Sequence, residues 1–283
     1  IAIMKEPLTI ALIYDFDGTL APGNMQEYDF IPAVGKSNKE FWHDANQLAE
    51  EQDADMVLTY MARMIQEARS KGLSMRSEEF QESGRRVTLY KGVREWFARI
   101  NAYGAARGIR ILHYINSSGL KEIIEGTEIA HEFRRIYACS FLYDIDGVAY
   151  WPAVAVNYTN KTQFIFKINK GVESVFDSKL VNQYIEEDKR PVPFRRMIYV
   201  GDGTTDIPCM RLVKNSGGHS IAVYNPEIRN ARRELNGLIR DNRVSHVCPA
   251  DYSEGSEMDT LVKTIIDKIE ADHRLELLET PRT

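Results

Sequence analysis

The sequence predicts an α/β protein with a doubly wound parallel sheet, a small all-helical cap domain and a β-hairpin insertion. Short, continuous apolar runs bounded by turn residues recur along the chain, and amphipathic segments lie between them. Strands buried on both faces that alternate with helices are typical of parallel sheets. Residues 22–89 break this alternation and show helical patterns alone. We therefore expect a core domain of residues 1–21 and 90–283 and a helical cap domain of residues 22–89.

The predicted strands are apolar runs that end in Gly, Ser, Asn or Asp. The first covers residues 8–14 and is bounded by Pro7 and by the turn-forming pair Asp17-Gly18. Because it is apolar throughout, we expect both of its faces to be buried. The other predicted strands cover residues 109–115, 196–200, 220–224 and, with a weaker pattern, 244–247.

The predicted helices show apolar residues at spacings of three and four. Residues 93–106 are the clearest case, and this segment ends near Gly108. Alternating residues around Asp146-Gly147 predict a β-hairpin over 140–150. Further helices are expected at 161–168, 226–239 and 258–269 in the core, and at 41–51, 56–71 and 77–87 in the cap.

The composition is that of an ordinary globular protein. The 283 residues are 43% hydrophobic and 27% charged, and the net charge is −5, which excludes disordered, collagen-like and coiled-coil chains. No basic patch favours nucleic acid or an anionic membrane as a partner. No apolar run approaches the roughly 20 residues of a membrane span, and no signal-peptide pattern opens the sequence. We expect a cytoplasmic protein whose three cysteines are reduced.

Polar motifs follow three of the predicted strands. They are Asp15-Phe-Asp-Gly-Thr19, Ser117-Ser-Gly119 and Gly201-Asp-Gly-Thr-Thr-Asp206. Parallel strands share one carboxyl edge, and ligands bind there in open α/β sheets. We therefore expect these three segments to meet, although they lie far apart in the sequence.

The residue types at that edge suit a divalent cation and a phosphate group. Asp15, Asp17, Asp202 and Asp206 would repel one another without a cation, and carboxylate oxygens without His or Cys favour Mg²⁺. Glycines allow the backbone to approach an anion, and serine hydroxyls can donate to phosphate oxygens. A lysine is still needed to balance the charge, and Lys161 is the best placed. The predicted phosphate-binding residues are Gly18, Ser117, Ser118, Gly119 and Lys161.

Each of these motifs has a simpler interpretation when it stands alone. The first is often only a metal site or an Asp-rich turn, and the third resembles a surface turn or part of a calcium loop. Ser-Ser-Gly commonly caps a helix, and Lys161 could be a solvated surface lysine. The combination, each at a predicted strand end or helix start, favours a shared site.

The set of motifs resembles that of the haloacid dehalogenase-like hydrolase superfamily. The Asp15 motif is similar to its first motif, Ser117 to the second, Lys161 to the third and the Gly201–Asp206 segment to the fourth. The helical insertion after the first motif is similar to the first-position cap of that superfamily. The hairpin after the second motif resembles its phosphoserine-phosphatase-like branch.

This resemblance implies a role for each residue. Asp15 would attack phosphorus and form an aspartyl-phosphate, and Asp17 would act as general acid and then general base. Mg²⁺ would be held by the Asp15 carboxylate, the Asp17 backbone carbonyl and Asp202. Asp206 would position the ligands or Lys161, while Ser117 and Lys161 would stabilise the phosphoryl oxygens.

The resemblance implies a Mg²⁺-dependent phosphatase that acts on a small phosphorylated metabolite. Asp17 favours a phosphate ester, because a halide leaving group needs no proton. A phosphotransferase or mutase with the same intermediate, and a non-catalytic binding or regulatory protein, stay open, as does the oligomeric state. Phosphoserine phosphatases carry a substrate-binding glutamate where this chain has Asn24, with Glu27 nearby. An acidic cap also disfavours a polyanionic substrate, although acids that only face solvent are the simpler interpretation.

Overall fold

A sheet of seven strands forms the centre of the part of the chain that the computed structural model describes, residues 7–279. Its order is β4-β3-β2-β1-β5-β6-β7, and every neighbouring pair is parallel except β3 with β4. This arrangement confirms the predicted α/β fold class. The predicted core domain also includes residues 1–6 and 280–283, which lie outside the described residues. The strands are β1 (Leu8–Tyr14), β2 (Ile109–Leu120), β3 (Arg135–Tyr143), β4 (Ala149–Val154), β5 (Met197–Gly201), β6 (His219–Tyr224) and β7 (His246–Pro249).

Strand β1 lies in the middle of the sheet and is buried along its whole length. Tyr14, its last residue, pairs with Ile115 on β2 and with Val200 on β5. The residues that follow these three positions therefore lie at the same edge of the sheet. This register is what brings the Asp15, Ser117 and Asp202 segments together.

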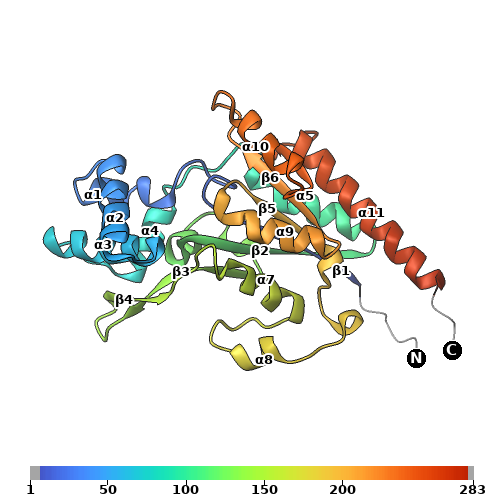
Figure 1. Cartoon of the computed structure of the whole chain (residues 1–283), viewed down its shortest axis with the longest axis horizontal. Coiled ribbons are helices and arrows are strands. Elements are labelled where there is room, and N and C mark those ends of the chain that lie inside the picture. The colour runs from blue at the N-terminus through green and yellow to red at the C-terminus, as the bar shows by residue number, and fades with distance from the viewer. Residues whose placement is uncertain (1–6, 280–283) are drawn as a thin grey trace.

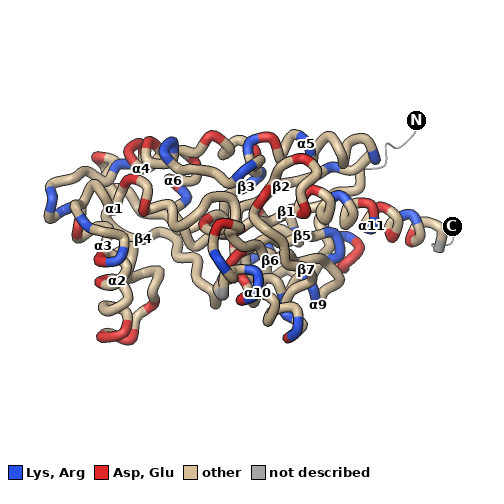
Figure 2. Tube along the Cα trace, turned by 90° about the horizontal axis from the view of Figure 1, so that it is seen from above, with Lys and Arg blue, Asp and Glu red and all other residues tan. Residues whose placement is uncertain are grey.

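Helices cover both faces of the sheet. Helix α5 (Val93–Ala105) lies on one side of the strands and α9 (Ile207–Asn215) on the other (Figure 2). Helix α5 contacts α11 (Glu257–Glu279), and α9 contacts α7 (Lys161–Lys170). The remaining core helices are α6 (Lys121–Glu125), α8 (Ser178–Asn182) and α10 (Ala231–Arg240).

The segment predicted as a helical cap contains α1 (Phe30–Ala33), α2 (Asn38–Gln52), α3 (Met56–Ser70) and α4 (Ser77–Gly84). These helices gather at the end of the molecule beside β3 and β4 (Figure 1). Helix α3 contacts β4, α4 contacts α6, and the rings of Phe80 and Phe141 stack with centroids 5.8 Å apart. That the segment is a domain of its own stays a prediction.

Several elements differ from the sequence-based expectation: α1, α6 and α8 were not predicted, and α11 runs to Glu279 rather than ending near residue 269. Strand β2 continues from Ile115 to Leu120, because the Asn-Ser-Ser-Gly sequence forms an irregularity in the β2–β3 pairing rather than a turn. Helix α10 begins at Ala231 rather than near Pro226, because Asn230 has a left-handed φ of 66°. Helix α9, which the apolar pattern did not predict, begins with proline in its first turn.

The predicted hairpin is present and belongs to the main sheet. Strand β3 pairs with β2 on one side and with β4 on the other.

Within residues 7–279, the helices are all too short or too polar to form a membrane span.

Candidate active site

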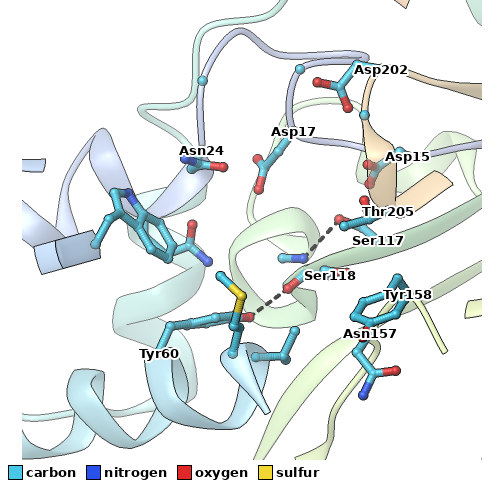
Figure 3. Close-up of a pocket in the computed structure, with 18 of the residues that line it drawn as sticks. Asp15, Asp17, Asn24, Tyr60, Ser117, Ser118, Asn157, Tyr158, Asp202 and Thr205 are labelled. Atoms are coloured by element: carbon cyan, nitrogen blue, oxygen red, sulfur yellow. Dashed lines mark hydrogen bonds between the residues drawn. The ribbon is translucent and has the colours of Figure 1, made fainter. Parts of the chain in front are cut away.

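The ends of β1 and β5 bring Asp15 and the Gly201–Asp206 segment to one point. The Asp15 amide donates to the Val200 carbonyl at 2.9 Å, and the Asp15 side chain is only 9% exposed. Figure 3 shows Asp15, Asp17 and Asp202 around one end of a cavity, with Ser117 beside them. The expected convergence of the three motifs is therefore present in the structure.

Three carboxylates form a tight group at this edge. One oxygen from each of Asp15, Asp202 and Asp206 lies within 4.8 Å of the others. Among the described residues, no lysine or arginine forms an ion pair with Asp202. Burial, and then the negative charge of Asp15, raise the pKa of Asp202 well above its usual range. The group is a set of oxygen ligands short of positive charge.

Lys161 supplies the positive charge that the sequence required. This side chain is fully buried at the start of α7, and its Nζ lies 3.2 Å from Asp15 Oδ2 and 2.6 Å from Asp206 Oδ1. The Tyr199 hydroxyl donates to the same Asp206 oxygen at 2.6 Å. Burial works against the ammonium, but Asp15 and Asp206 keep the pKa of Lys161 raised. Asp206 thus holds the lysine against Asp15.

Burial, followed by the charge of Asp206, raises the pKa of Asp15 to about 7, although Lys161 opposes that shift. A divalent cation among these carboxylates would stabilise their charged forms and so lower these pKa values. The donor set is made of hard oxygen ligands and suits Mg²⁺. The residues present therefore fit such an ion.

Asp17 stands between the acidic group and the cavity. Its Oδ1 accepts a hydrogen bond from the Met25 amide at 2.9 Å, which fixes the carboxyl group. Burial, and then the charge of Asp15, raise the pKa of Asp17 well above its usual range. This environment favours the protonated form of the Asp17 carboxyl group.

Gly18 gives the turn after β1 its shape. Its φ is +70°, and a Cβ on it would lie 1.9 Å from Asp202 Oδ2. A left-handed backbone and this close approach both require glycine. The residue therefore lets the first and fourth motifs touch.

The second motif lies at the irregular end of β2. The Ser117 Oγ accepts from the Gly119 amide at 3.0 Å. The Ser118 Oγ is buried without a hydrogen-bond partner, and a Cβ on Gly119 would lie 3.2 Å from Asp17 Oδ2. All three residues line the cavity, so the predicted phosphate-binding groups face the acids.

The cavity has a volume of about 740 Å³ and lies between the sheet edge and the helical segment. Trp42 and Tyr60 line it, although sequence reasoning assigned them no role, and Gln26 lines it without having been singled out. The Tyr60 hydroxyl donates to the Ser118 carbonyl at 2.7 Å. At helical spacing Trp42 and Tyr60 resemble ordinary packing positions, and Gln26 lies outside the predicted helices, so the sequence carried no signal for these three residues.

The position of Glu27 differs from that of a substrate-binding carboxylate. Asn24 lines the cavity, whereas Glu27 is not among its described lining residues. Glu27 Oε1 accepts from the Trp42 indole at 2.8 Å and from Asn24 Nδ2 at 2.8 Å. Its carboxylate therefore orients two cavity residues.

The sequence and the fold both have recognisable relatives. An uncharacterized protein of Borreliella burgdorferi is 28% identical, over 92% of this chain and 96% of its own length. A HAD family hydrolase from Salmonella enterica subsp. enterica serovar Typhi has a similar structure, with a TM-score of 0.59 and 16% identity, over 93% of this chain and 74% of that one.

A phosphoserine phosphatase, solved with an analogue of its phospho-aspartyl intermediate, gives a TM-score of 0.54 at 15% identity, over 91% of this chain and 99% of that one. At these identities the structural likeness shows a shared fold. The family model for haloacid dehalogenase-like hydrolases matches residues 12–211, most of the chain, and covers all four motifs. The chain therefore belongs to the haloacid dehalogenase-like hydrolase family.

Proposed function

We propose that this protein is a Mg²⁺-dependent phosphatase that hydrolyses the phosphomonoester of a small metabolite through a phosphorylated Asp15. The observation that carries this proposal is the contact of Lys161 with Asp15, at 3.2 Å, beside the carboxylate of Asp202. A nucleophilic carboxylate, an ammonium group and a cation site then surround one phosphoryl position. Membership of a hydrolase family supports the same reaction class.

In the first step an Asp15 oxygen attacks phosphorus, and the bond between phosphorus and the ester oxygen breaks. Asp17 gives its proton to the leaving alkoxide, so the alcohol departs neutral. In the second step Asp17 takes a proton from water as the water oxygen attacks phosphorus. The acyl-phosphate bond breaks, inorganic phosphate leaves, and Asp15 is again a carboxylate.

The protein groups that stabilise the phosphoryl oxygens are Lys161, the Ser117 hydroxyl and the backbone after β1. Each is held before the substrate arrives, because Asp206 fixes Lys161 at 2.6 Å and the Gly119 amide fixes Ser117 at 3.0 Å. Such preorganised donors are usually the largest part of catalysis. Mg²⁺ held by Asp15, Asp202 and the Asp17 carbonyl would neutralise further phosphoryl charge when bound.

A phosphate-release assay against a panel of phosphate esters tests this function. The wild type is expected to release phosphate with Mg²⁺ present, and Asp15→Asn to release none while keeping the circular dichroism spectrum of the folded wild type. Asp53→Asn, an exposed acid on the helical segment, serves as the charge-matched control. Wild-type turnover by Asp15→Asn would refute the nucleophile, and an isomerised product without free phosphate would indicate a mutase.

A further inference from the structure

The cavity has two chemically different ends. Asp15 and Asp202 lie at one end, where the phosphoryl group would bind, and Tyr60 lies on the side away from Asp202 (Figure 3). That second side takes its lining from α2, from the start of α3 and from the loop after β4. The alcohol portion of an ester bound at Asp15 would face these residues.

Positive side chains are missing from the cavity lining. Among the described residues that line it, none is lysine, arginine or histidine, whereas Asp55 and Glu234 add two acids. Lys161 is fully buried and already paired with Asp15 and Asp206. A second anionic group on the substrate would therefore find no cationic partner.

The start of α3 is the positive pole of a helix, and it also lines the cavity. Asp55 Oδ1 accepts from the amides of Val57 and Leu58, each at 2.9 Å, and so covers that pole with a full negative charge. Its Oδ2 accepts from Asn157 at 2.7 Å. The helix end offers an anion no open donor at these amides.

Gln26 gives an independent indication of what binds. Its side chain is 1% exposed and lines the cavity, and its Oε1 has no hydrogen-bond partner. A buried carbonyl oxygen without a donor is costly. A ligand N–H or O–H would satisfy it, and an ammonium N–H would do so most strongly.

Two aromatic rings also line the cavity beside Gln26 and Asp55. The rings of Trp42 and Tyr60 meet edge to face, with centroids 5.8 Å apart and an interplanar angle of 70°. The indole N–H is bound to Glu27 and the phenol to the Ser118 carbonyl. Because their polar ends are engaged, the rings present aromatic surface, which attracts organic cations.

Building on the phosphatase function above, we propose that the substrate is a phosphomonoester whose alcohol carries an ammonium group and no second anion. The acceptor of Gln26, the rings of Trp42 and Tyr60, and the carboxylate of Asp55 in the cavity lining all favour a cation with N–H donors. The phosphate end and this ammonium end would together span the cavity.

Three esters of similar size separate charge from fit. They are 2-aminoethyl phosphate, its neutral isostere propyl phosphate, and the anionic carboxymethyl phosphate. We expect kcat/KM to fall about tenfold from the amine to the propyl ester, and further to the carboxymethyl ester. Calorimetric binding of the three esters to Asp15→Asn, with Mg²⁺ present, should give the same order without turnover.

Two variants assign the preference to residues. Gln26→Leu should reduce the ratio of kcat/KM for the amine over the propyl ester, because it removes the orphan acceptor. Asp55→Asn keeps a capping side chain but loses the charge, and should reduce the same ratio. Asp53→Asn makes the same charge change outside the cavity lining and should leave the ratio unaltered.

The outcomes test the ammonium preference separately from the phosphatase activity. Equal or better kcat/KM for the propyl or carboxymethyl ester would overturn the ammonium assignment while the phosphatase stands. No phosphate release from any ester would overturn the phosphatase, and the calorimetric order would still decide for or against ammonium recognition. If both Gln26→Leu and Asp55→Asn keep the preference for the amine, these two residues do not recognise the ammonium group.

Discussion

The two aspartates of the first motif are expected to have separable roles. Asp17 is held by the Met25 amide at 2.9 Å, and an asparagine carbonyl oxygen can accept the same hydrogen bond. Asp17→Asn should therefore keep its geometry and lose only the proton. We expect a loss of roughly 10²–10⁴-fold in kcat for alkyl phosphates, which need a proton on the leaving oxygen.

The leaving group provides the control for this prediction. p-Nitrophenolate is a far better leaving group than an alkoxide and needs little protonation. Asp17→Asn should therefore slow the formation of the aspartyl-phosphate less with p-nitrophenyl phosphate than with an alkyl phosphate. The measurement is the burst of p-nitrophenol from wild type and Asp17→Asn, set against single-turnover cleavage of an alkyl ester. Equal losses on both esters would contradict a general-acid role.

Gly18 offers a test of contact rather than charge. Alanine there would force a left-handed φ of +70° and place a Cβ 1.9 Å from Asp202 Oδ2. Gly108 has nearly the same φ, +69°, but a Cβ would meet nothing within 4 Å. Both alanine variants should lose about 1–2 kcal/mol of stability from the backbone.

Only Gly18→Ala should also lose activity and Mg²⁺ affinity, because it displaces the Asp202 carboxylate. The readouts are the free energy of unfolding in urea and the Mg²⁺ concentration for half-maximal phosphate release. Loss of Mg²⁺ affinity in Gly108→Ala to the same degree would show that backbone strain alone accounts for the effect.

A buried network behind β1 predicts sensitivity to acid. His113 Nδ1 lies 3.0 Å from the Tyr14 hydroxyl, its Nε2 lies 2.9 Å from Asn101 Oδ1, and the Trp96 indole donates to Tyr14 at 2.9 Å. These partners suit a neutral ring that donates from Nε2. Burial lowers the pKa of His113 from 6.5 to about 3.

In the unfolded chain His113 takes up a proton below pH 6.5, whereas in the folded chain it stays neutral down to about pH 3. Stability should therefore fall as pH falls through this window, by at most about 1.4 kcal/mol per pH unit from this group. Urea unfolding at several pH values measures the slope, and His113→Gln should flatten it. An unchanged slope in that variant would assign the acid sensitivity to other groups.

At the scale of elements, sequence patterns predicted where strands begin more reliably than how they pair. The apolar run predicted for β1 matched the observed Leu8–Tyr14. A central strand is buried on both faces, so every residue in it is apolar or nearly so and the run has clear ends. Strand β2 ran beyond its predicted end, since Asn116-Ser-Ser-Gly reads locally as a turn. The pairing with β3 is interrupted after Asn116 and resumes at Leu120, and such an interrupted pairing is invisible in a single sequence.

The same distinction applies to the site. Asp15 and Asp202 were found because strand ends share one edge, a rule of topology that needs no side-chain detail. Lys161 was found because the charge there needs a balancing cation and this lysine opens a predicted helix. Trp42 and Tyr60 were not found, because their role depends on how α2 and α3 pack on the core, and neither was Gln26, which lies in a short 3-10 turn over 25–27. A helical residue that faces a cavity and one that faces a core have the same spacing.

The contact of α3 with the core is itself testable. The Tyr60 hydroxyl donates to the Ser118 carbonyl at 2.7 Å, and this bond joins α3 to the end of β2. Tyr60→Phe should leave that carbonyl with only the weak thiol donor of Cys139, at 3.3 Å, cost about 1 kcal/mol, and speed amide hydrogen exchange in α3. Tyr158→Phe, which removes a hydroxyl from a side chain that is 60% exposed, is the control. Unaltered exchange in Tyr60→Phe would show that other contacts hold the helix.

At the scale of the whole molecule, the acidic group links cation binding to folding. Asp15 follows β1 and Asp202 follows β5, so an ion held by both would join neighbouring strands that are distant in sequence. Mg²⁺ that binds only the folded chain should stabilise it by about 2.7 kcal/mol at a hundredfold excess over Kd. For a chain of this size that is a rise in Tm of roughly 5 °C.

The variant Asp202→Asn separates the effect of carboxylate repulsion on stability from the effect of Mg²⁺ binding. Without Mg²⁺ this variant should melt above the wild type, because it removes one of three closely spaced, mutually repelling carboxylates. With Mg²⁺ its Tm should hardly move, whereas that of the wild type should rise and fall back when EDTA is added. Thermal melts of both proteins in Mg²⁺ and in EDTA show which of the two has the higher Tm under each condition. A wild type whose Tm ignores Mg²⁺, or a variant that responds as the wild type does, would mean that these carboxylates do not bind the ion.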